Sequence, residues 1–244
     1  LFTTETSTVG PLSLLESIRN VNKEIKFYQA SSAEMYGGSL REPLDEDSKF
    51  EPKSPYAAAK VFAFDITKIY RESYNMFTSN GILFNHESPR RGETFVTRKI
   101  SKAVGRIHVG IQEKLTLGNL DSYRDWGFAG DYVKGMWKML QYPQPEDWVI
   151  ATGETYSVKD FTKEAFGLIG LNHEEYITSS EKYFRPNEVD YLLGNPKKAL
   201  DNLGWKPETD FKELVKMMVN HDINEAKKEY TLLKEKLISP TWES

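Results

Sequence analysis

The feature that most constrains the fold is an alternation of helical and β-rich patterns over the first third of the chain. Apolar residues recur at helical spacing in 12–19, and the short run 24–30 is rich in residues that favour strands. A second helical pattern at 55–74 leads to a second β-rich run at 77–84. A helix followed by a strand, twice over, is typical of an α/β fold with a doubly wound parallel sheet.

The remaining chain continues this pattern less regularly. A polar loop containing proline is predicted at 39–53. Helical spacing predicts further helices at 95–109, through 132–140, at 157–168 and from 211 onward, the last with fraying near 227. Runs rich in β-forming residues predict strands at 114–117 and 148–151. Ser157, with Asp160 three residues later, matches a variant of the capping box at a helix start.

Residues 54–60, Ser-Pro-Tyr-Ala-Ala-Ala-Lys, indicate the first turn of a helix with a serine N-cap and proline at the first helical position. Tyr56 and Lys60 are four residues apart and therefore share one helix face. A lysine ammonium favours the phenolate form of a nearby tyrosine, and a phenolate is a general base. The spacing alone is weak evidence, because Tyr230 and Lys234 repeat it in a charged segment where a solvated surface is the simpler interpretation.

Polar side chains follow both of the first two predicted strands. Residues 31–34, Ser-Ser-Ala-Glu, come after the first strand, and 85–87, Asn-His-Glu, come after the second. In open α/β sheets, ligands bind outside the carboxyl ends of the strands. We therefore expect these two segments and the helix start at Tyr56 to converge on one site.

Composition excludes several other classes of protein. The 244 residues include 32 basic and 36 acidic side chains, so the net charge of −4 gives no reason to expect nucleic acid or a membrane as the main partner. No apolar run approaches the roughly 20 residues of a membrane helix. The chain has no cysteine, which fits a reducing compartment, and we expect a cytoplasmic protein. Its four histidines lack metal-ligand spacing, so no metal site is predicted.

Several segments resemble one known family. Ser31-Ser32 followed by Tyr56 and Lys60 is similar to the Ser/Thr–Tyr–Lys constellation of the extended short-chain dehydrogenases/reductases. Within that group, the chain from Val9 to Asp222 resembles the GDP-mannose 4,6-dehydratases. The segments that carry the closer resemblance are 80–92, 95–100, 117–120, 124–127 and 185–190. The first of them, Asn-Gly-Ile-Leu-Phe-Asn-His-Glu-Ser-Pro-Arg-Arg-Gly, is far more specific than a Tyr–Lys pair.

The resemblance implies a partial Rossmann-type fold and an NADP-dependent lyase acting on GDP-mannose. Such enzymes oxidise the sugar at carbon 4, eliminate water across carbons 5 and 6, and yield GDP-4-keto-6-deoxymannose on the route to GDP-fucose. By resemblance, Ser32 binds the carbon-4 oxygen, where many members have threonine, and Tyr56 is the base for the first step. Lys60 assists Tyr56 and binds the cofactor, and Glu34 removes the carbon-5 proton.

The resemblance also assigns binding residues. His86 and Arg91 join Tyr56 and Lys60 in holding NADP. The residues matched to the nucleotide sugar are Asn85, Arg98, Arg124, Arg185 and Glu188. Arginines suit a diphosphate because the guanidinium group binds phosphate oxygens bidentately. The alternatives are a hydrogen-bonded structural histidine at 86 and ordinary surface or subunit-contact charges at the arginines.

The expected organisation is two interleaved lobes. Residues 1–84 and 119–154 would form a remnant of the NADP-binding Rossmann domain, and 85–118 with 155–244 the nucleotide-sugar-binding domain. No glycine-rich dinucleotide fingerprint occurs in the chain. The resemblance places Leu1 inside the cofactor domain, so we expect a preceding segment in a complete member and no activity from these residues alone. Homologues pair as homodimers or homotetramers.

Two alternatives remain open at this stage. One is another nucleotide-sugar dehydratase, or an epimerase, of the same fold. Glu34 bears on this choice, because 4-epimerases need no carbon-5 base and usually have a small residue at that position. The other is a non-catalytic chain that binds a nucleotide sugar or stabilises an oligomer.

Overall fold

The computed structural model describes residues 1–38, 42–180, 187, 189–240 and 242. The chain divides into two compact units. Unit 1 comprises Leu1–His86, Ser122–Tyr156 and Arg185–Thr209, and unit 2 comprises Glu87–Asp121, Ser157–Phe184 and Asp210–Ser244. Residues 189–209, which were expected in the nucleotide-sugar-binding lobe, group here with unit 1. These pack with unit 1, where, for example, Leu44 N–H donates to the Leu193 carbonyl at 2.8 Å.

Unit 1 is built on a parallel sheet of three strands, in the order β1 (Phe27–Ser32), β2 (Thr78–Leu83) and β7 (Asp147–Ile150). Ser32 is paired with Leu83, and Leu83 is paired with Ile150. The three strands therefore end at one edge of the sheet. The predicted α/β class with a parallel sheet is confirmed.

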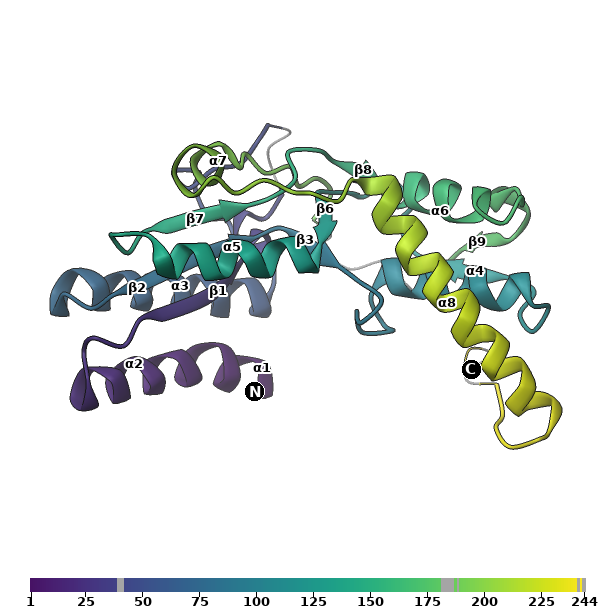
Figure 1. Ribbon diagram of the computed structural model, residues 1–244, viewed down its shortest axis with the longest axis horizontal. Helices are drawn as coiled ribbons and strands as arrows, with labels where there is room; N and C mark the ends of the chain where they lie inside the picture. The colour runs from purple at the N-terminus through teal and green to yellow at the C-terminus, as the bar shows by residue number, and fades with distance from the viewer. Residues whose placement is uncertain (39–41, 181–186, 188, 241, 243–244) are drawn as a thin grey trace. The chain divides into compact units, whose positions relative to one another are not determined.

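Helices cover both faces of this sheet (Figure 1). Successive residues of β2 point to opposite faces. On one face, Asn80 Nδ2 donates to the Phe64 carbonyl of α3 (Pro55–Tyr74). On the other, a Cβ at Gly81 would lie 3.1 Å from Met139 of α5 (Ala129–Gln141). The other helices of the unit are α1 (Phe2–Thr4), the π-helix Glu5–Val9, α2 (Gly10–Val21), the 3₁₀ turn η2 (Ala33–Tyr36) and α7 (Lys197–Leu203). Glycine at 81 lets α5 approach the sheet closely.

The start of α3 follows from its sequence. Ser54 has extended backbone angles, and its hydroxyl accepts the N–H of Ala57 at 3.0 Å. Pro55 occupies the first helical position, where a missing N–H costs nothing. The helix ends at Tyr74, because Asn75 adopts a left-handed conformation with φ of 52°. The predicted helix at 55–74 is confirmed with both of its ends.

A buried polar network lies beneath α3 in the centre of the sheet. Ser31 Oγ is 3.3 Å from Asn80 Oδ1, and Asn80 Nδ2 donates to Asp147 Oδ1 at 2.9 Å. Arg71 Nη2 in turn donates to both Asp147 carboxylate oxygens, at 2.8 and 2.9 Å. The three strands are therefore linked by side chains as well as by their ladder.

The loop before α3 covers the outer edge of β7. Glu46 Oε1 accepts the backbone N–H of Val149 at 2.7 Å, a donor that β2 does not use. Burial raises the pKa of the Glu46 carboxyl, and this hydrogen bond opposes the rise. The loop therefore satisfies a strand-edge donor that would otherwise face water or another chain.

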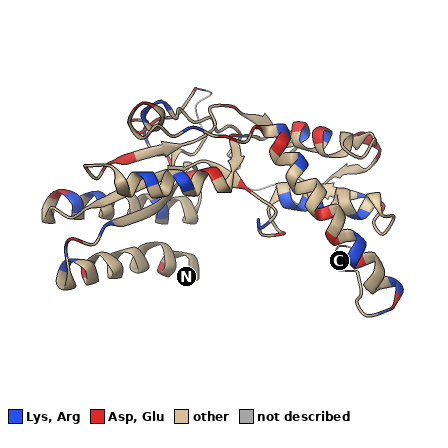
Figure 2. Ribbon diagram, viewed as in Figure 1, with Lys and Arg blue, Asp and Glu red and all other residues tan. Residues whose placement is uncertain are grey.

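Unit 2 is mainly helical, with α4 (Val96–His108), α6 (Val158–Gly167) and α8 (Phe211–Lys234) and the parallel strand pair β4 (Leu115–Leu117) and β9 (Ile177–Ser179). The capping box predicted at the start of α6 is present, since Ser157 and Asp160 exchange side-chain and backbone hydrogen bonds. Helix α8 continues to Lys234 rather than fraying near Lys227, and acidic and basic residues are interspersed along it (Figure 2). No helix among the described residues is long and apolar enough to cross a membrane.

Helices α4 and α8 meet at Gly105. A Cβ there would lie 2.5 Å from the Asp222 carbonyl oxygen and 2.9 Å from the Ile223 nitrogen, both backbone atoms that cannot move alone. We expect Gly105→Ala to lower the free energy of unfolding by about 2–3 kcal/mol, because α8 must shift to relieve the overlap. Chemical denaturation of the two proteins measures this difference.

Gly167→Ala is the matched control for this prediction. Gly167 is also helical, but a Cβ there would meet nothing within 4 Å. Alanine is the better helix former, so this variant should be unchanged or more stable by up to about 1 kcal/mol. Equal stability of the two variants would contradict the close approach of α4 and α8.

Candidate active site

The first group of predicted site residues follows β1. Ser32 is the last residue of the strand and the N-cap of η2, and its hydroxyl accepts the Glu34 N–H at 3.2 Å. This cap turns the chain immediately after the strand. It therefore keeps a partly buried hydroxyl and a partly buried carboxylate two residues apart at the carboxyl edge of the sheet.

The second group lies on the first turns of α3. Tyr56 is 41% exposed, so its ring is accessible in the described structure. Lys60 Nζ lies 5.6 Å from the centroid of that ring and donates to the Ala30 carbonyl at 2.9 Å. Burial lowers the pKa of Lys60. The lysine therefore ties the tyrosine-bearing face of α3 to β1, two residues before Ser32.

The third group follows β2. Asn85 and His86 begin the short strand β3 (Asn85–Glu87), and both are partly buried. His86 Nδ1 lies 2.8 Å from the Phe84 carbonyl, so Nδ1 carries the proton, since a carbonyl can only accept. The imidazole also stacks on Tyr132, with ring centroids 5.0 Å apart. The orientation of His86 is therefore set from both its edge and its face.

Arg124 ends the short strand β5 (Tyr123–Arg124), and Asp125 lies between it and the next short strand, β6 (Trp126–Phe128). Arg124 is largely buried, and its Nη1 donates to the Tyr123 carbonyl at 2.9 Å. Asp125 is fully buried and accepts four hydrogen bonds, from Thr152 N–H and Oγ1, Gly153 N–H and Gly194 N–H, at 2.7–3.2 Å. The carboxylate thus joins three segments at the end of β7.

Asp125 predicts a pH dependence of stability. Burial raises its pKa to about 6 against the opposing hydrogen bonds, so between about pH 4 and 6 the folded protein binds this proton more tightly than the unfolded chain. The free energy of unfolding should therefore fall as pH rises through that window. Relative to Asp125→Asn, which does not titrate, we expect a fall of about 1–3 kcal/mol. Denaturation curves across the window measure it.

The control for this experiment is Asp121→Asn. Asp121 is exposed, and no described residue donates a hydrogen bond to its side chain. Its stability curve should remain parallel to that of the unchanged protein. Parallel curves for Asp125→Asn as well would show that the Asp125 carboxylate does not carry the pH dependence.

In unit 2, the predicted diphosphate ligand Arg98 has protein partners. Its Nη2 lies 2.8 Å from Asp222 Oδ1, its Nε donates to the same oxygen at 3.1 Å, and its Nη1 donates to the Pro89 carbonyl. Asp222 is buried and also accepts the Ser101 hydroxyl at 2.5 Å. The guanidinium of Arg98 is therefore occupied by an internal ion pair in this structure, and binding of phosphate by Arg98 stays a prediction.

Other predicted features have different outcomes. Arg185 and Glu188 lie outside the described residues. Among the described residues, no three His, Asp or Glu side chains are grouped as a metal site would require.

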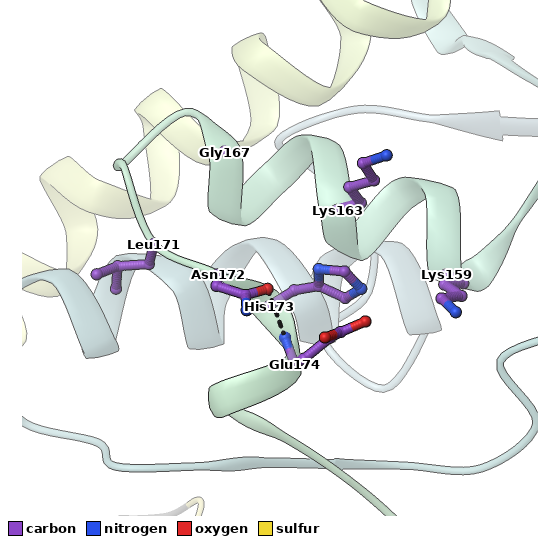
Figure 3. A pocket seen from close by; sticks show the side chains of 7 residues that line it. All are labelled: Lys159, Lys163, Gly167, Leu171, Asn172, His173 and Glu174. Carbon is purple, nitrogen blue, oxygen red and sulfur yellow. Dashed lines mark hydrogen bonds between the residues drawn. The ribbon is translucent and has the colours of Figure 1, made fainter.

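An open pocket of about 540 Å³ in unit 2 contains none of the predicted site residues (Figure 3). It is lined by Lys159, Lys163, Gly167, Leu171, Asn172, His173 and Glu174.

Sequence reasoning missed Asp125, Asp222 and Glu87 as organising residues. Each is a buried carboxylate. Asp125 and Asp222 have partners far away in the sequence, and Glu87 lies at the start of a loop that shows no helical or strand periodicity. For Asp125, the one available signal was an acidic residue next to a tryptophan in the matched segment 124–127. A charged residue among apolar neighbours is rarely buried unless it is paired.

Comparison with known proteins finds a matching family and similar relatives. The family described as "GDP-mannose 4,6 dehydratase" matches residues 1–218. "GDP-mannose 4,6 dehydratase 1" of Arabidopsis thaliana is 52% identical over 235 residues, covering 95% of this chain and 65% of that protein. The Homo sapiens "GDP-mannose 4,6 dehydratase" is 47% identical over 241 residues, covering 91% of this chain and 65% of that protein. The chain thus spans about two thirds of the length of these relatives.

Similarity to solved structures identifies the type of fold. "RMD from Pseudomonas aeruginosa complexed with NADPH" superposes with a TM-score of 0.82 at 19% identity, covering 91% of this chain and 74% of that one. The dTDP-glucose 4,6-dehydratase of Bacillus anthracis, in complex with NAD, gives a TM-score of 0.81 at 20% identity, covering 93% and 70%. The fold is therefore Rossmann-type. With the matched family and the sequence identity of its relatives, the chain belongs to the GDP-mannose 4,6-dehydratase family.

Proposed function

We propose that the protein converts GDP-mannose to GDP-4-keto-6-deoxymannose. The observation that carries this proposal is the grouping at the end of β1, where Ser32 and Glu34 follow the strand and Lys60 joins it to the helix of Tyr56. A hydroxyl, a carboxylate and a tyrosine–lysine pair are the groups that oxidation followed by elimination requires. The relatives named as GDP-mannose dehydratases support the choice of substrate.

A nicotinamide cofactor fits the residues present. Lys60 presents a fixed ammonium, and Arg91 presents a guanidinium whose terminal amines have no hydrogen-bond partner in the part of the chain that the structure describes. Cations of this kind suit the ribose hydroxyls and phosphates of a dinucleotide. Tyr56, Lys60, His86 and Arg91 would hold it, and NADP is our proposed form. When bound, the cofactor supplies the oxidising and reducing equivalents of the reaction.

In the first step, Tyr56 takes the proton of the carbon-4 hydroxyl while Ser32 hydrogen-bonds to that oxygen. Free tyrosine has a pKa of about 10, so a base acting near neutral pH needs its phenolate stabilised by roughly 4 kcal/mol. The ammonium of Lys60 lies 5.6 Å from the Tyr56 ring centroid and favours the phenolate. Anchoring of Lys60 to the Ala30 carbonyl keeps that charge in place.

In the second step, Glu34 takes the proton from carbon 5, which the new ketone at carbon 4 has acidified. The hydroxyl at carbon 6 then takes up a proton and leaves as water. The reducing equivalents that the cofactor would supply at carbon 6, with a proton from solvent at carbon 5, complete the 6-deoxy product. Glu34 suits this role because the Ser32 cap fixes its backbone N–H while its side chain remains partly exposed. The presence of this carboxylate favours dehydration over simple inversion at carbon 4.

The nucleotide sugar would be bound by Asn85, Arg124, Arg185 and Glu188, together with Arg98 if its ion pair with Asp222 opens. We further propose a cytoplasmic homodimer or homotetramer that supplies the GDP-fucose route. Exposed apolar residues on α2 and α3, such as Leu14, Phe62 and Ile69, support self-association.

The test is to identify the product formed from GDP-mannose by the full-length protein with NADP. A 4-keto-6-deoxy sugar, detected by mass spectrometry and NMR as loss of one water, supports the proposal. Inversion at carbon 4 without loss of water would identify an epimerase. Binding of GDP-mannose without any turnover would identify a non-catalytic chain.

A further inference from the structure

Arg91 is held on two sides by residues of its own loop. Its Nε lies 3.1 Å from Glu87 Oε2, and its guanidinium carbon lies 3.7 Å from the centroid of the Phe95 ring. Its terminal amines have no hydrogen-bond partner among the described residues, and 24% of the side chain is exposed. Its Nε forms no aligned hydrogen bond, so the group is held at its inner edge by the charge of Glu87 and at one face by the Phe95 ring, while its outer end remains open.

Glu87 is the buried member of this pair. Only 1% of the residue is exposed, and its Oε2 also accepts the Thr97 hydroxyl at 2.6 Å. Burial raises the pKa of the Glu87 carboxyl, while the charge of Arg91 and the Thr97 hydrogen bond oppose the rise. A buried carboxylate retains its charge only beside such partners. Thr97 therefore orients Glu87, and Glu87 in turn orients Arg91.

The backbone of the loop is fixed as well. The Arg91 N–H donates to the Ser88 carbonyl at 2.9 Å, which closes a turn, and Arg98 Nη1 donates to the Pro89 carbonyl. Arg98 is itself anchored by Asp222. The loop that carries Arg91 is therefore tied to both α4 and α8.

The three arginines of this region differ in what they offer a ligand. Arg98 is buried, and its guanidinium is engaged by Asp222 and a backbone carbonyl. Arg90 is exposed, and no ion pair holds its side chain in the described structure. Arg91 alone of the three combines a fixed position with an open end. Such a preorganised guanidinium binds a phosphate with less loss of side-chain entropy than a free one.

We propose that Glu87 and Phe95 are positioning residues that hold the Arg91 guanidinium ready for a phosphate group of the cofactor. Glu87 acts through the inner edge of the guanidinium, and Phe95 supports its face. Neither residue needs to touch the ligand. The inference rests on the proposed function, because it takes the cofactor as the source of the phosphate.

The test is titration calorimetry of NADP⁺ and, separately, of GDP-mannose with the full-length protein. Glu87→Gln keeps an acceptor for Thr97 but removes the charge facing Arg91, so we expect NADP⁺ affinity to fall about 3- to 10-fold. Phe95→Leu should give a similar loss, and Phe95→Tyr, which keeps the stacked ring, should restore it. GDP-mannose affinity should stay unchanged in Glu87→Gln.

Glu93→Gln is the matched control. Glu93 lies in the same loop, is exposed, and pairs with Lys102 instead of Arg91, at 2.6 Å. Its NADP⁺ affinity should equal that of the unchanged protein. The guanidinium group of Arg91, followed by NMR without any cofactor, should be more mobile in Glu87→Gln than in Glu93→Gln.

Arg91→Ala separates failure of this inference from failure of the proposed function. If Arg91→Ala weakens NADP⁺ binding but Glu87→Gln and Phe95→Leu do not, the positioning role is wrong and the cofactor role of Arg91 stands. If Arg91→Ala leaves NADP⁺ affinity unchanged, the cofactor role itself is wrong. Equal losses of NADP⁺ and GDP-mannose affinity in Glu87→Gln would show a general structural role and overturn the inference.

Discussion

Replacing Tyr56 by phenylalanine in the full-length protein is expected to lower the turnover of GDP-mannose by about 10²–10⁴-fold. The substitution removes only the phenolic oxygen, which is the group that we propose accepts the proton of the carbon-4 hydroxyl. Lys60 keeps its hydrogen bond to the Ala30 carbonyl, so the first turns of α3 should not change. Turnover number and the Michaelis constant for GDP-mannose, measured separately, should show a loss confined to turnover.

The chain contains its own control for this experiment. Tyr230 also precedes a lysine by four residues, on α8, and is 46% exposed. Tyr230→Phe removes the same atom from the same spacing at a place with no polar strand end nearby in the sequence. It should leave turnover unchanged. Comparable losses in both variants would contradict the role of Tyr56 as the base.

Glu34→Gln should separate the two halves of the reaction. The amide is close in size to the carboxylate but is not a base, so elimination should slow by about 10²–10⁴-fold. Oxidation at carbon 4, which depends on Tyr56, should persist and be visible as the near-ultraviolet absorbance of reduced nicotinamide in a single turnover. A second measurement follows the proton itself. Product formed in D₂O should carry deuterium at carbon 5 in the unchanged protein, and Glu34→Gln should form this product correspondingly slowly.

Glu51→Gln is the matched control for Glu34. The Glu51 side chain is 48% exposed and lies 3.3 Å from Lys49 on the surface loop before α3. Removing the negative charge of Glu51 should change neither the rate of oxidation nor the rate of elimination. If Glu34→Gln forms the 4-keto-6-deoxy product at the normal rate, another group removes the carbon-5 proton and the mechanism proposed for Glu34 is wrong.

The secondary structure was predictable where the pattern was long or well capped. The helix at 55–74 could be found from its apolar spacing, Ser54 and Pro55, and the capping box at Ser157 marked the start of α6. The strands that were missed are two or three residues long, too short to show a period of two. They are β3, β5, β6, β8 (Tyr156–Ser157) and β9.

The sequence pattern alone does not assign every segment to a unit. Local pattern gave no sign that the segment around Gly194 packs with the first unit. That assignment depends on Asp125, 69 residues earlier, which accepts the Gly194 N–H. Pairings of this length depend on burial in the finished fold, which single-sequence patterns do not report.

Some features of the candidate site could be predicted from the sequence and others could not. Ser32, Tyr56 and Lys60 could be brought together from strand ends and helix spacing, because parallel strands place their carboxyl ends at one edge. The partner of Arg98 could not, since Asp222 lies 124 residues away on α8. A guanidinium assigned to a ligand by motif is instead engaged by a buried carboxylate, and only the three-dimensional packing reveals this.

The contact between Glu46 and β7 has a consequence beyond the fold of this one chain. In the described sheet, β7 is an outer strand, and its Val149 N–H points to the Glu46 carboxylate. An exposed strand edge is a template on which another copy can add a strand and begin to aggregate. A partly buried negative charge at this donor blocks that addition. We therefore expect Glu46→Ala to make the concentrated protein more prone to edge-to-edge aggregation, an effect separate from any catalytic chemistry.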